Sequence, residues 1–308
     1  MAPLEIRDEH LLAQDRLTLP AVTPDPVGHG VTRLRASFLW GNSFSWTQDV
    51  EGENPEDRRF LLDGETRTLD LALTRGLSAS TDVSLRLPVR WRGGGVLDGF
   101  IDCWHRAFSF LGIDNGGRPA FLQDAFRVEG ITTDKRPFSW NDEAGLGLGN
   151  LEVSGRWRFH ERGVAAALVA RASLPTATAP FEGSWGGGLQ LVARRPLGPS
   201  WEVHAGVGGT GESQPSGAGF RYSTTRVQAF AALSWRAWPR LSLSVETDVA
   251  SRLVRDIDRY PGVHWLINGG ARFAASRKTV LEVGLTENIK DQRSTTDFAL
   301  YFAVVARP

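Results

Sequence analysis

From residue 31 onward, apolar and polar residues alternate with a period of two along most of the chain. In the stretch LSLSVETDV, every second residue from Leu241 to Val245 is apolar, and serines stand between them. The same alternation recurs in residues 151–159, 201–207 and 296–306. Successive side chains of a β-strand point to opposite faces of the sheet, so this period predicts an all-β protein.

Twelve strands are predicted, and many of them have ten residues or more. A strand that crosses a bilayer at a tilt needs about 9–11 residues, whereas strands of soluble sheets usually have roughly five or six. The predicted strands occupy residues 32–46, 58–75, 80–92, 145–159, 164–175, 186–195, 201–211, 222–236, 241–250, 262–274, 279–288 and 296–306.

The connections between these strands alternate in length. Short turns lie at residues 76–78, 161–163, 196–200, 237–240 and 275–278. The other connections are mostly longer and occupy residues 47–57, 93–144, 176–185, 212–221, 251–261 and 289–295. Short turns on one rim and long loops on the other are typical of an outer-membrane barrel, whose two termini lie on the periplasmic side.

The alternation by itself also fits a soluble barrel or sandwich with the two faces exchanged. Long strands, alternating connections and aromatic residues near strand ends favour the membrane, because Trp and Tyr gather at membrane interfaces. These aromatic residues are Trp40, Trp46, Trp91, Trp201, Tyr222, Trp235 and Trp238. We therefore predict one antiparallel transmembrane β-barrel of about twelve strands at residues 31–308, surrounded by lipids of the Gram-negative outer membrane.

Charged residues of the strands are predicted to line the lumen, since the apolar residues of a membrane barrel face lipid. Arginine outnumbers the acidic residues in this set, which favours anions unless the charges pair with one another. The predicted lumen-lining residues are Arg33, Arg35, Asp70, Arg86, Arg90, Glu152, Arg156, Arg158, Arg171, Arg194, Glu202, His204, Arg226, Glu246, Asp248, Arg272, Glu282 and Asp297.

Residues 93–118 show a helical period instead. An apolar stripe is formed by Leu97, Ile101, Trp104 and Phe108, and a polar stripe beside it by Asp98, Asp102, His105 and Ser109. The pattern predicts a helix in the long extracellular loop 93–144, where it caps or plugs the barrel. The carboxylates and the imidazole of the polar stripe are candidate ligand-binding groups, and the alternative is a solvated helix face.

The first 30 residues are polar and contain several prolines, which predicts an N-terminal periplasmic tail with little regular structure. Charges follow soon after Met1, so we expect the signal peptide to be absent from this chain. The sequence contains no run of about 18 apolar residues, so no transmembrane helix is predicted. Lys plus Arg and Asp plus Glu number 35 each, which gives no sign of a nucleic-acid partner. Cys103 is the single cysteine, and neither a metal nor a cofactor is predicted.

The chain resembles a family of Gram-negative outer-membrane barrels that has no established activity. The resemblance rests mainly on residues 62–67 (LDGETR), 93–108, 146–159 and 173–178, and it covers the chain from about residue 30. It implies a barrel of this kind, and it adds Arg118 to the candidate ligand-binding residues. Two features depart from the pattern: Ala177 stands where Gly is expected, and the last strand does not end on an aromatic residue.

Three functions fit these patterns. The first is a channel or transporter that passes a small solute through a polar, arginine-rich lumen. The second is a structural or ligand-binding surface protein with a plugged lumen. The third is an outer-membrane hydrolase, for which His204, Glu246 and Asp248 could meet across strands, although the chain lacks a Gly-x-Ser-x-Gly motif. We favour the channel over an enzyme, and a monomer over an oligomer.

Overall fold

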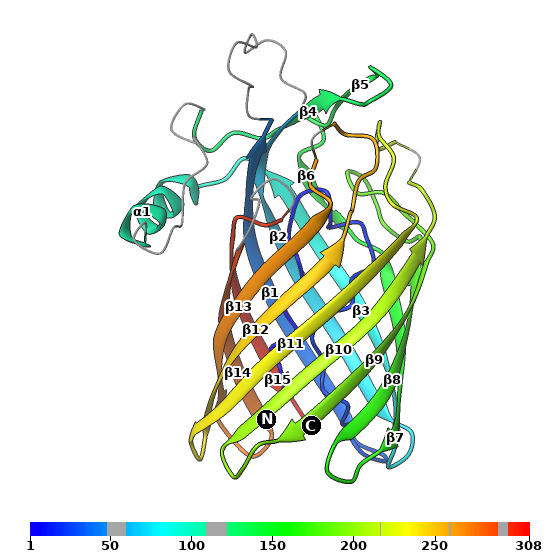
Figure 1. Cartoon of the computed structure of the whole chain (residues 1–308), viewed down its shortest axis with the longest axis vertical. Coiled ribbons are helices and arrows are strands. Elements are labelled where there is room, and N and C mark those ends of the chain that lie inside the picture. Colours follow the sequence, from blue (N-terminus) through cyan, green and yellow to red (C-terminus); the bar gives the residue numbers. More distant parts are fainter. Residues whose placement is uncertain (48–59, 109–121, 216, 259, 289–294) are drawn as a thin grey trace.

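The computed structural model describes residues 1–47, 60–108, 122–215, 217–258, 260–288 and 295–308. Fifteen strands in these ranges form one antiparallel sheet that closes on itself. Twelve of them make the barrel wall, and β4, β5 and the short β6 are additions near one rim (Figure 1). The predicted all-β fold with about twelve strands and one helix is confirmed.

The wall strands lie close to their predicted bounds. They are β1 (Thr32–Trp46), β2 (Phe60–Gly76), β3 (Thr81–Gly93), β7 (Leu151–His160), β8 (Ala165–Leu174), β9 (Gly186–Pro196), β10 (Trp201–Glu212), β11 (Thr225–Trp238), β12 (Leu241–Ser251), β13 (Val263–Ala274), β14 (Thr279–Asn288) and β15 (Phe298–Ala306). Neighbouring strands pair in chain order, and β1 pairs with β15, from Leu34 opposite Ala306 to Asn42 opposite Phe298. This last pairing closes the ring of twelve wall strands.

The strand predicted at residues 145–159 is interrupted. Its first part, β6 (Gly145–Leu148), pairs with the upper half of β3, whereas β7 pairs with the lower half. A Cβ atom at Gly149 would lie 2.9 Å from the Arg90 guanidinium and from Pro88. The absence of a side chain therefore lets the chain pass close to β3 at the interruption.

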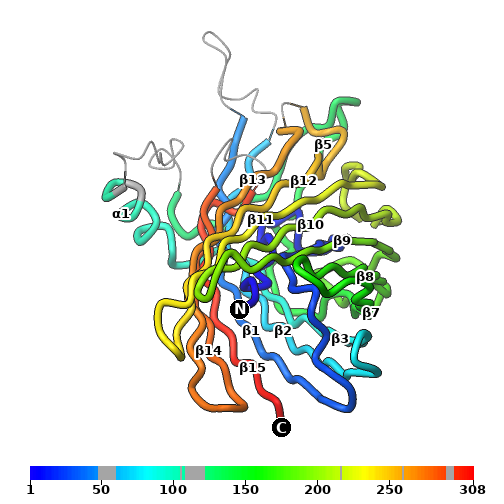
Figure 2. Tube along the Cα trace, turned by 60° about the horizontal axis from the view of Figure 1, so that its bottom comes forward, coloured from blue at the N-terminus to red at the C-terminus, as the bar shows by residue number. Residues whose placement is uncertain are grey.

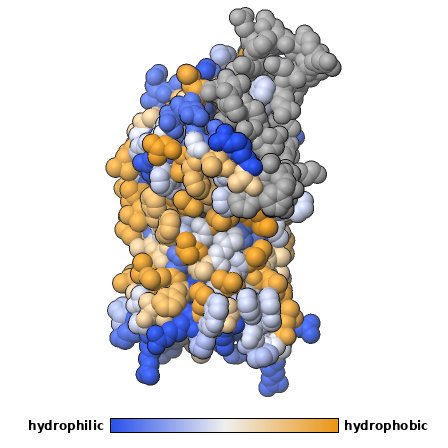
Figure 3. All heavy atoms as spheres, turned by 90° about the vertical axis from the view of Figure 1, so that its left-hand side faces the viewer, coloured by the Kyte–Doolittle hydropathy of each residue, from blue (hydrophilic) through white to orange (hydrophobic). Residues whose placement is uncertain are grey.

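The outer face of the wall is apolar. On β2, Leu69, Leu71 and Leu73 are exposed, whereas the alternating residues Thr68, Asp70 and Thr74 are buried. Figure 3 shows apolar residues over the middle of the wall and hydrophilic residues at its lower end. Apolar side chains outside and charges inside are the arrangement of a membrane barrel, and a soluble barrel would have the reverse. No helix among the described residues is long and apolar enough to span a membrane.

The N-terminal residues do not form a tail outside the barrel, so this prediction was wrong. Residues 3–26, which we call the inner segment, run inside the barrel as the dark blue trace of Figure 1, without pairing in the sheet. The segment rises from the rim of short turns, reverses around residues 10–16 and descends again. The backbone amide of Ala13 donates to the His10 carbonyl, and that of Arg16 to the Ala13 carbonyl, which forms the reversal. Figure 2 shows the segment within the ring of strands, viewed toward that rim.

Apolar side chains hold the inner segment in place. Leu4 and Ile6 pack on Leu39, Tyr301 and Ala303 of the inner wall. On the returning limb, the small residues Ala21 and Val22 fill a second patch lined by Ala167, Val169, Val192 and Phe230. These wall patches are inward positions that carry apolar residues, so burying them against the segment removes them from lumen water.

The helix α1 (Asp98–Phe108) forms where the sequence predicts it, but it lies outside the barrel (Figure 1). Leu97 and Ile101 pack on Phe298 of β15, with Trp40 and Leu300 beside them. Leu300 and Trp40 belong to the outward sets of β15 and β1. The helix therefore neither plugs the barrel nor brings its polar stripe to the lumen, because its apolar stripe finds an apolar surface only on the outer wall.

The rest of the long insertion caps the barrel. Its strands β4 (Arg127–Ile131) and β5 (Pro137–Ser139) form a hairpin that was not predicted and that extends the upper end of β2. An apolar cluster above the inner segment joins this hairpin to two other long loops. We call it the cap, and it comprises Leu11, Leu12, Ala13, Phe60, Leu62, Val128, Phe138, Trp140, Ala218, Phe220, Tyr222, Leu253, Val254, Ile257 and Tyr260.

Candidate functional site

The candidate site is the lumen, where the charged wall residues meet the inner segment. One network centres on Glu152 of β7. Its carboxylate accepts two hydrogen bonds from Arg7 of the inner segment, at 2.9 and 3.2 Å, and one from Arg86 at 2.6 Å. Arg86 also pairs with Asp70. Arg7 therefore adds a second cation to a wall network in which Arg86 alone bridges two carboxylates.

A second network holds the start of the inner segment. Arg35 of β1 pairs with Glu282 of β14 at 2.8 Å and donates to the Leu4 carbonyl at 2.9 Å. The Tyr301 hydroxyl donates to the same Glu282 at 2.6 Å, and Arg272 pairs with Glu282 as well. A backbone carbonyl of the segment thus joins a cluster that four wall strands, β1, β13, β14 and β15, build.

A third network holds the descending limb. The Asp25 carboxylate pairs with Arg194 of β9 at 3.0 Å and with Arg158 of β7 at 3.3 Å. Arg156 donates to the backbone carbonyl of Thr23 at 2.7 Å and to that of Asp25 at 2.9 Å. The segment is therefore fixed at several heights of the lumen by charge-assisted hydrogen bonds, which are stronger than neutral ones.

The remaining predicted lumen residues also point inward or touch the inner segment. Glu246 accepts from the Leu4 amide, and Arg90 pairs with Asp15 at 3.4 Å. Contacts within the wall join Asp248 to Asn268, Arg194 to Glu202, Arg226 to the Ser251 carbonyl, Arg33 to Thr74, and Asp297 to Asn288. Arg171 belongs to the inward set of β8, together with the buried Val169 and Ser173. The pairing that the sequence left open is thus the dominant state of the lumen charges.

Glycines of the inner wall make room for the inner segment. A Cβ atom at Gly284 would lie 3.1 Å from the Ile6 side chain and 3.4 Å from Leu4. A Cβ atom at Gly188 would lie 3.2 Å from Leu19. The inner surface is therefore shaped to the segment. No local pattern of the sequence indicates this third partner.

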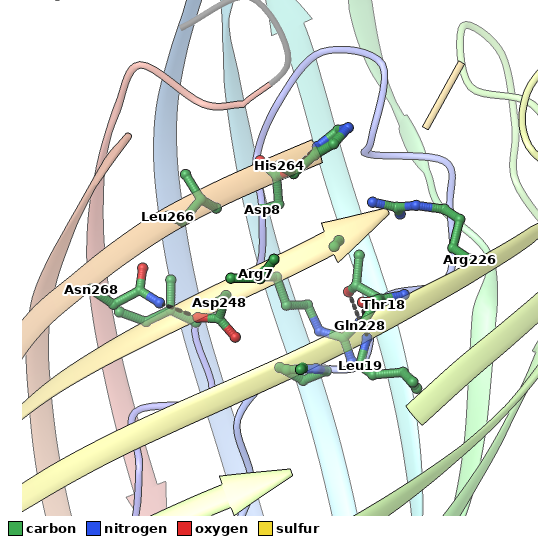
Figure 4. A pocket seen from close by; sticks show the side chains of 15 residues that line it. Arg7, Asp8, Thr18, Leu19, Arg226, Gln228, Asp248, His264, Leu266 and Asn268 are labelled. Atoms are coloured by element: carbon green, nitrogen blue, oxygen red, sulfur yellow. Dashed lines mark hydrogen bonds and ion pairs between the residues drawn. The ribbon is translucent and has the colours of Figure 1, made fainter. Parts of the chain in front are cut away.

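A small cavity remains between the inner segment and strands β11 to β13. It measures about 50 Å³ and lies beside the polar residues Asp8, Arg226, Asp248 and His264 (Figure 4). The His264 ring stands 3.6 Å from the Asp8 carboxylate, which also accepts from the Thr296 hydroxyl at 2.8 Å. A cavity of this size that several polar groups line can hold a few water molecules, which would let the segment exchange its contacts for hydration.

The geometry does not assemble the residues considered for hydrolysis. His204 lies 3.5 Å from Glu202 on its own strand, β10. In the strand register, His204 stands opposite Ala232 and Ala232 opposite Glu246. Two strand spacings separate the imidazole position from the carboxylate position, or about 10 Å.

The candidate ligand residues of the helix lie outside the lumen. Asp98 is buried and accepts from the Asn42 side chain at 2.9 Å and from the Asp124 amide at 2.6 Å. Asp102 accepts from the Gln123 side chain at 3.4 Å. The His105 side chain and Arg118 lie outside the described residues. Among the described residues, no cluster of His, Cys, Asp or Glu side chains is placed to hold a metal ion.

Above the lumen, a buried arginine supports the cap. The Arg92 guanidinium lies 4.7 Å from the Trp140 ring and 5.1 Å from the Phe181 ring, and donates to the Pro180 carbonyl at 2.7 Å. It also pairs with Glu143 at the loop surface. Burial raises the pKa of the Glu143 carboxyl above its ordinary value, against the opposing effect of the Arg92 guanidinium. Cation–π contacts of this kind stabilise the closed loops.

A family model described as "Protein of unknown function (DUF3187)" matches residues 1–307. The chain belongs to this family. No curated protein matches the chain. Among solved structures, it is similar to the COG4313 outer membrane channel from Pseudomonas putida F1, with a TM-score of 0.63 and 12% identity over 94% of this chain and 100% of that one. This likeness shows the fold, which is that of an outer-membrane barrel.

Two further structures show lower similarity. The KdgM porin in complex with disordered oligogalacturonate gives a TM-score of 0.47 and 6% identity, over 90% of this chain and 98% of that chain. The P. putida toluene transporter TodX gives a TM-score of 0.45 and 9% identity, over 91% of this chain and 90% of that chain.

In this DUF3187 protein, two of the stretches that carried the resemblance meet on the outer wall. Glu65, from LDGETR, accepts hydrogen bonds from the backbone amides of Val96 and Leu97 and, at 2.6 Å, from the Trp40 indole. A Cβ atom at Gly95 would lie 1.7 Å from the Glu65 carboxyl carbon. The two stretches therefore form one joint that fixes the start of α1 to the barrel, because a carboxylate there satisfies amides that the helix leaves unpaired.

Proposed function

We propose that this protein is an outer-membrane channel or transporter for a small solute, and that the inner segment closes its lumen in the present conformation. The observation that supports a channel best is the polar lumen of a twelve-stranded barrel filled by a segment of the same chain that pairs with no strand. A wall of this size encloses space for a solute once the segment leaves.

The contacts between the inner segment and the wall are of a kind that can break and form again. Ion pairs such as Arg7 to Glu152 and Asp25 to Arg194 join groups that water and wall charges can also satisfy. Arg86, for example, keeps its ion pair with Glu152 when Arg7 leaves. The segment continues into β1 at the turn-side rim, so it can swing out through that mouth without any strand leaving the sheet.

The second candidate is a structural or surface-binding protein with a permanently plugged lumen. The cap favours it, because Leu11 and Leu12 of the inner segment are fully buried under Trp140 and Tyr260. Pulling them out exposes large apolar surfaces, at a cost of roughly 1.5–3 kcal/mol for each leucine. The two candidates differ in whether the seated segment ever leaves.

Residence in the outer membrane is part of the proposal. Stacked Trp201 and Trp235, with ring centroids 5.6 Å apart, lie on the outer wall near the turn-side rim. Toward the loop side, the Arg67 guanidinium lies 4.9 Å from the Trp40 ring and 4.4 Å from the Trp91 ring. Aromatic residues at both ends of an apolar wall are suited to the two membrane interfaces.

Planar-bilayer recordings of the refolded protein test the channel. Full-length protein is compared with a variant that lacks residues 3–24 and with a variant whose segment is locked by a disulfide. For the lock, cysteines replace Glu9 and Gly41, whose Cβ positions lie 2.7 Å apart, with Cys103→Ser to remove the native thiol. A disulfide needs about 3.5–4.5 Å between these atoms, so the segment must shift by about 1 Å.

We expect brief openings from the full-length protein, steady current from the deletion, and silence from the oxidised lock that reduction relieves. Heat-dependent migration on gels and circular dichroism verify that each variant is folded. Silence from both the deletion and the reduced lock, with the barrels inserted, would contradict the channel and leave the plugged surface protein.

A further inference from the structure

Cationic side chains crowd the turn-side mouth. A cavity of about 420 Å³ opens there between the base of the inner segment and the ends of β11 to β15. Its rim carries Arg236, Arg240, Arg277 and Lys278, all exposed, and Arg307 follows at the end of β15. Arg33 and Arg272 line it more deeply. The termini mark this mouth in Figure 1 and Figure 2.

These rim cations differ from the arginines of the lumen, which are paired. Higher in the barrel, Arg35, Arg86 and Arg194 each face a carboxylate within 3.2 Å. Within the described ranges, none of the rim cations forms an ion pair. Among the described residues that line the cavity, Asp25 is the single carboxylate, and it is already shared by Arg158 and Arg194. The mouth therefore carries an uncompensated positive charge.

We propose that this mouth binds an organic anion that carries two or more carboxylate or phosphate groups. Guanidinium groups bind both kinds of group through paired hydrogen bonds, and several of them converge here from different turns. The volume lies in the range of small-molecule sites, about 300–1,000 Å³. Trp238, Leu241 and Val280 give the cavity an apolar side for the carbon skeleton.

The proposal rests on the proposed channel only for the route that the anion takes. An anion held at this mouth sits against Thr23 and Pro26, at the base of the inner segment, and so stands where the solute path would begin. The same chemistry is offered by a dissolved anion and by an anionic lipid headgroup. The concave shape, with the segment as one of its walls, favours the dissolved anion.

Isothermal titration calorimetry of the full chain in amphipol at 0.15 M salt tests the site. The probe is citrate, and glucose is the neutral comparison. The test variant is R236Q/R240Q/R277Q. The control variant, R75Q/R162Q/R195Q, removes the same charge from arginines near the same rim that do not line the cavity. A parallel arm measures citrate competition in nanodiscs of phosphatidylglycerol or phosphatidylcholine.

We expect saturable citrate binding, no glucose binding, at least a tenfold weaker affinity in the test variant, and an unchanged affinity in the control. If phosphatidylglycerol competes with citrate and the test variant abolishes this competition, the anion site is supported and a lipid headgroup is its natural ligand. Absence of saturable binding, or an equal loss in both variants, would overturn the site. If the protein binds citrate but never conducts current, the anion site is supported and the channel is refuted. The two proposals can therefore fail separately.

Discussion

Truncating Arg7 should loosen the inner segment without damaging the barrel. Arg7→Ala removes two hydrogen bonds to Glu152, at 2.9 and 3.2 Å. The third hydrogen bond of Arg7, to Thr18 at 2.9 Å, joins two residues of the segment and is lost as well. Glu152 keeps its ion pair with Arg86 at 2.6 Å, so its carboxylate is not left without a partner. The change therefore acts on the segment and spares the wall.

The expected magnitude follows from these contacts. A hydrogen bond to a charged group contributes about 1.5–3 kcal/mol, and water that enters the lumen replaces part of it. We take about 2 kcal/mol as the loss, for the whole Arg7 side chain, in the free energy that favours the closed over the open position of the inner segment. Since about 1.4 kcal/mol is a factor of ten, the ratio of open to closed segment should rise about 30-fold.

Open probability in single-channel records measures this ratio directly. Arg195→Ala is the matched control, because Arg195 is exposed on β9 and lines no part of the lumen cavities. An Arg7→Ala protein that is folded and inserted, yet whose open probability stays within twofold of the wild type, would refute the seating of the segment by this ion pair. Equal increases in Arg7→Ala and Arg195→Ala would do the same, since the effect would then be one of net charge.

Three further predictions concern the wall, the joint and the cap. Gly284→Ala places a methyl group 3.1 Å from Ile6 and 3.0 Å from the Gly269 carbonyl oxygen of β13, and it should raise open probability about fivefold. Gly269→Ala, with no atom within 4 Å of the added methyl, should leave open probability unchanged, and equal effects would contradict the fit. Glu65→Ala should free α1 for cleavage by protease while the melting temperature of the barrel holds, and an unchanged digestion pattern would count against the joint. Trp140→Ala should lower the free energy of unfolding by about 3–5 kcal/mol and speed amide hydrogen exchange in the inner segment. Unchanged, slow hydrogen exchange would show that the cap does not protect the inner segment from water.

The wall of the barrel could be predicted because its signals are local. Each strand carries its own period of two, and a strand such as β12 shows its inward and outward faces within a few residues. The parity of short and long connections then fixes which rim each end reaches. The lumen residues were predicted from the alternation within each strand, and Arg86, Glu152 and Glu282 lie on the inward face. Which charges pair with which depends on register, and no local pattern contains it.

The helix shows the limit of a local signal. Its period predicted a helix and an apolar stripe, but an apolar stripe is equally compatible with a cap and with an apolar wall. Only the closed barrel provides Phe298 and Leu300 as an outward apolar surface beside the start of the insertion. An apolar stripe within a lumen of paired charges would have remained in contact with polar groups, so the outer wall is the stable position.

What the sequence by itself determined is the all-β class, the number of wall strands, their approximate bounds and the face on which each charge lies. The tertiary structure alone decided that residues 3–26 lie inside the barrel. That segment has no period to detect, because its partners are an irregular inner surface assembled from distant strands: Arg7 meets Glu152, 145 residues away in the chain, and Leu19 meets Gln228, 209 residues away. Contacts of this separation exist only once the sheet has closed, and the function of the lumen depends on them.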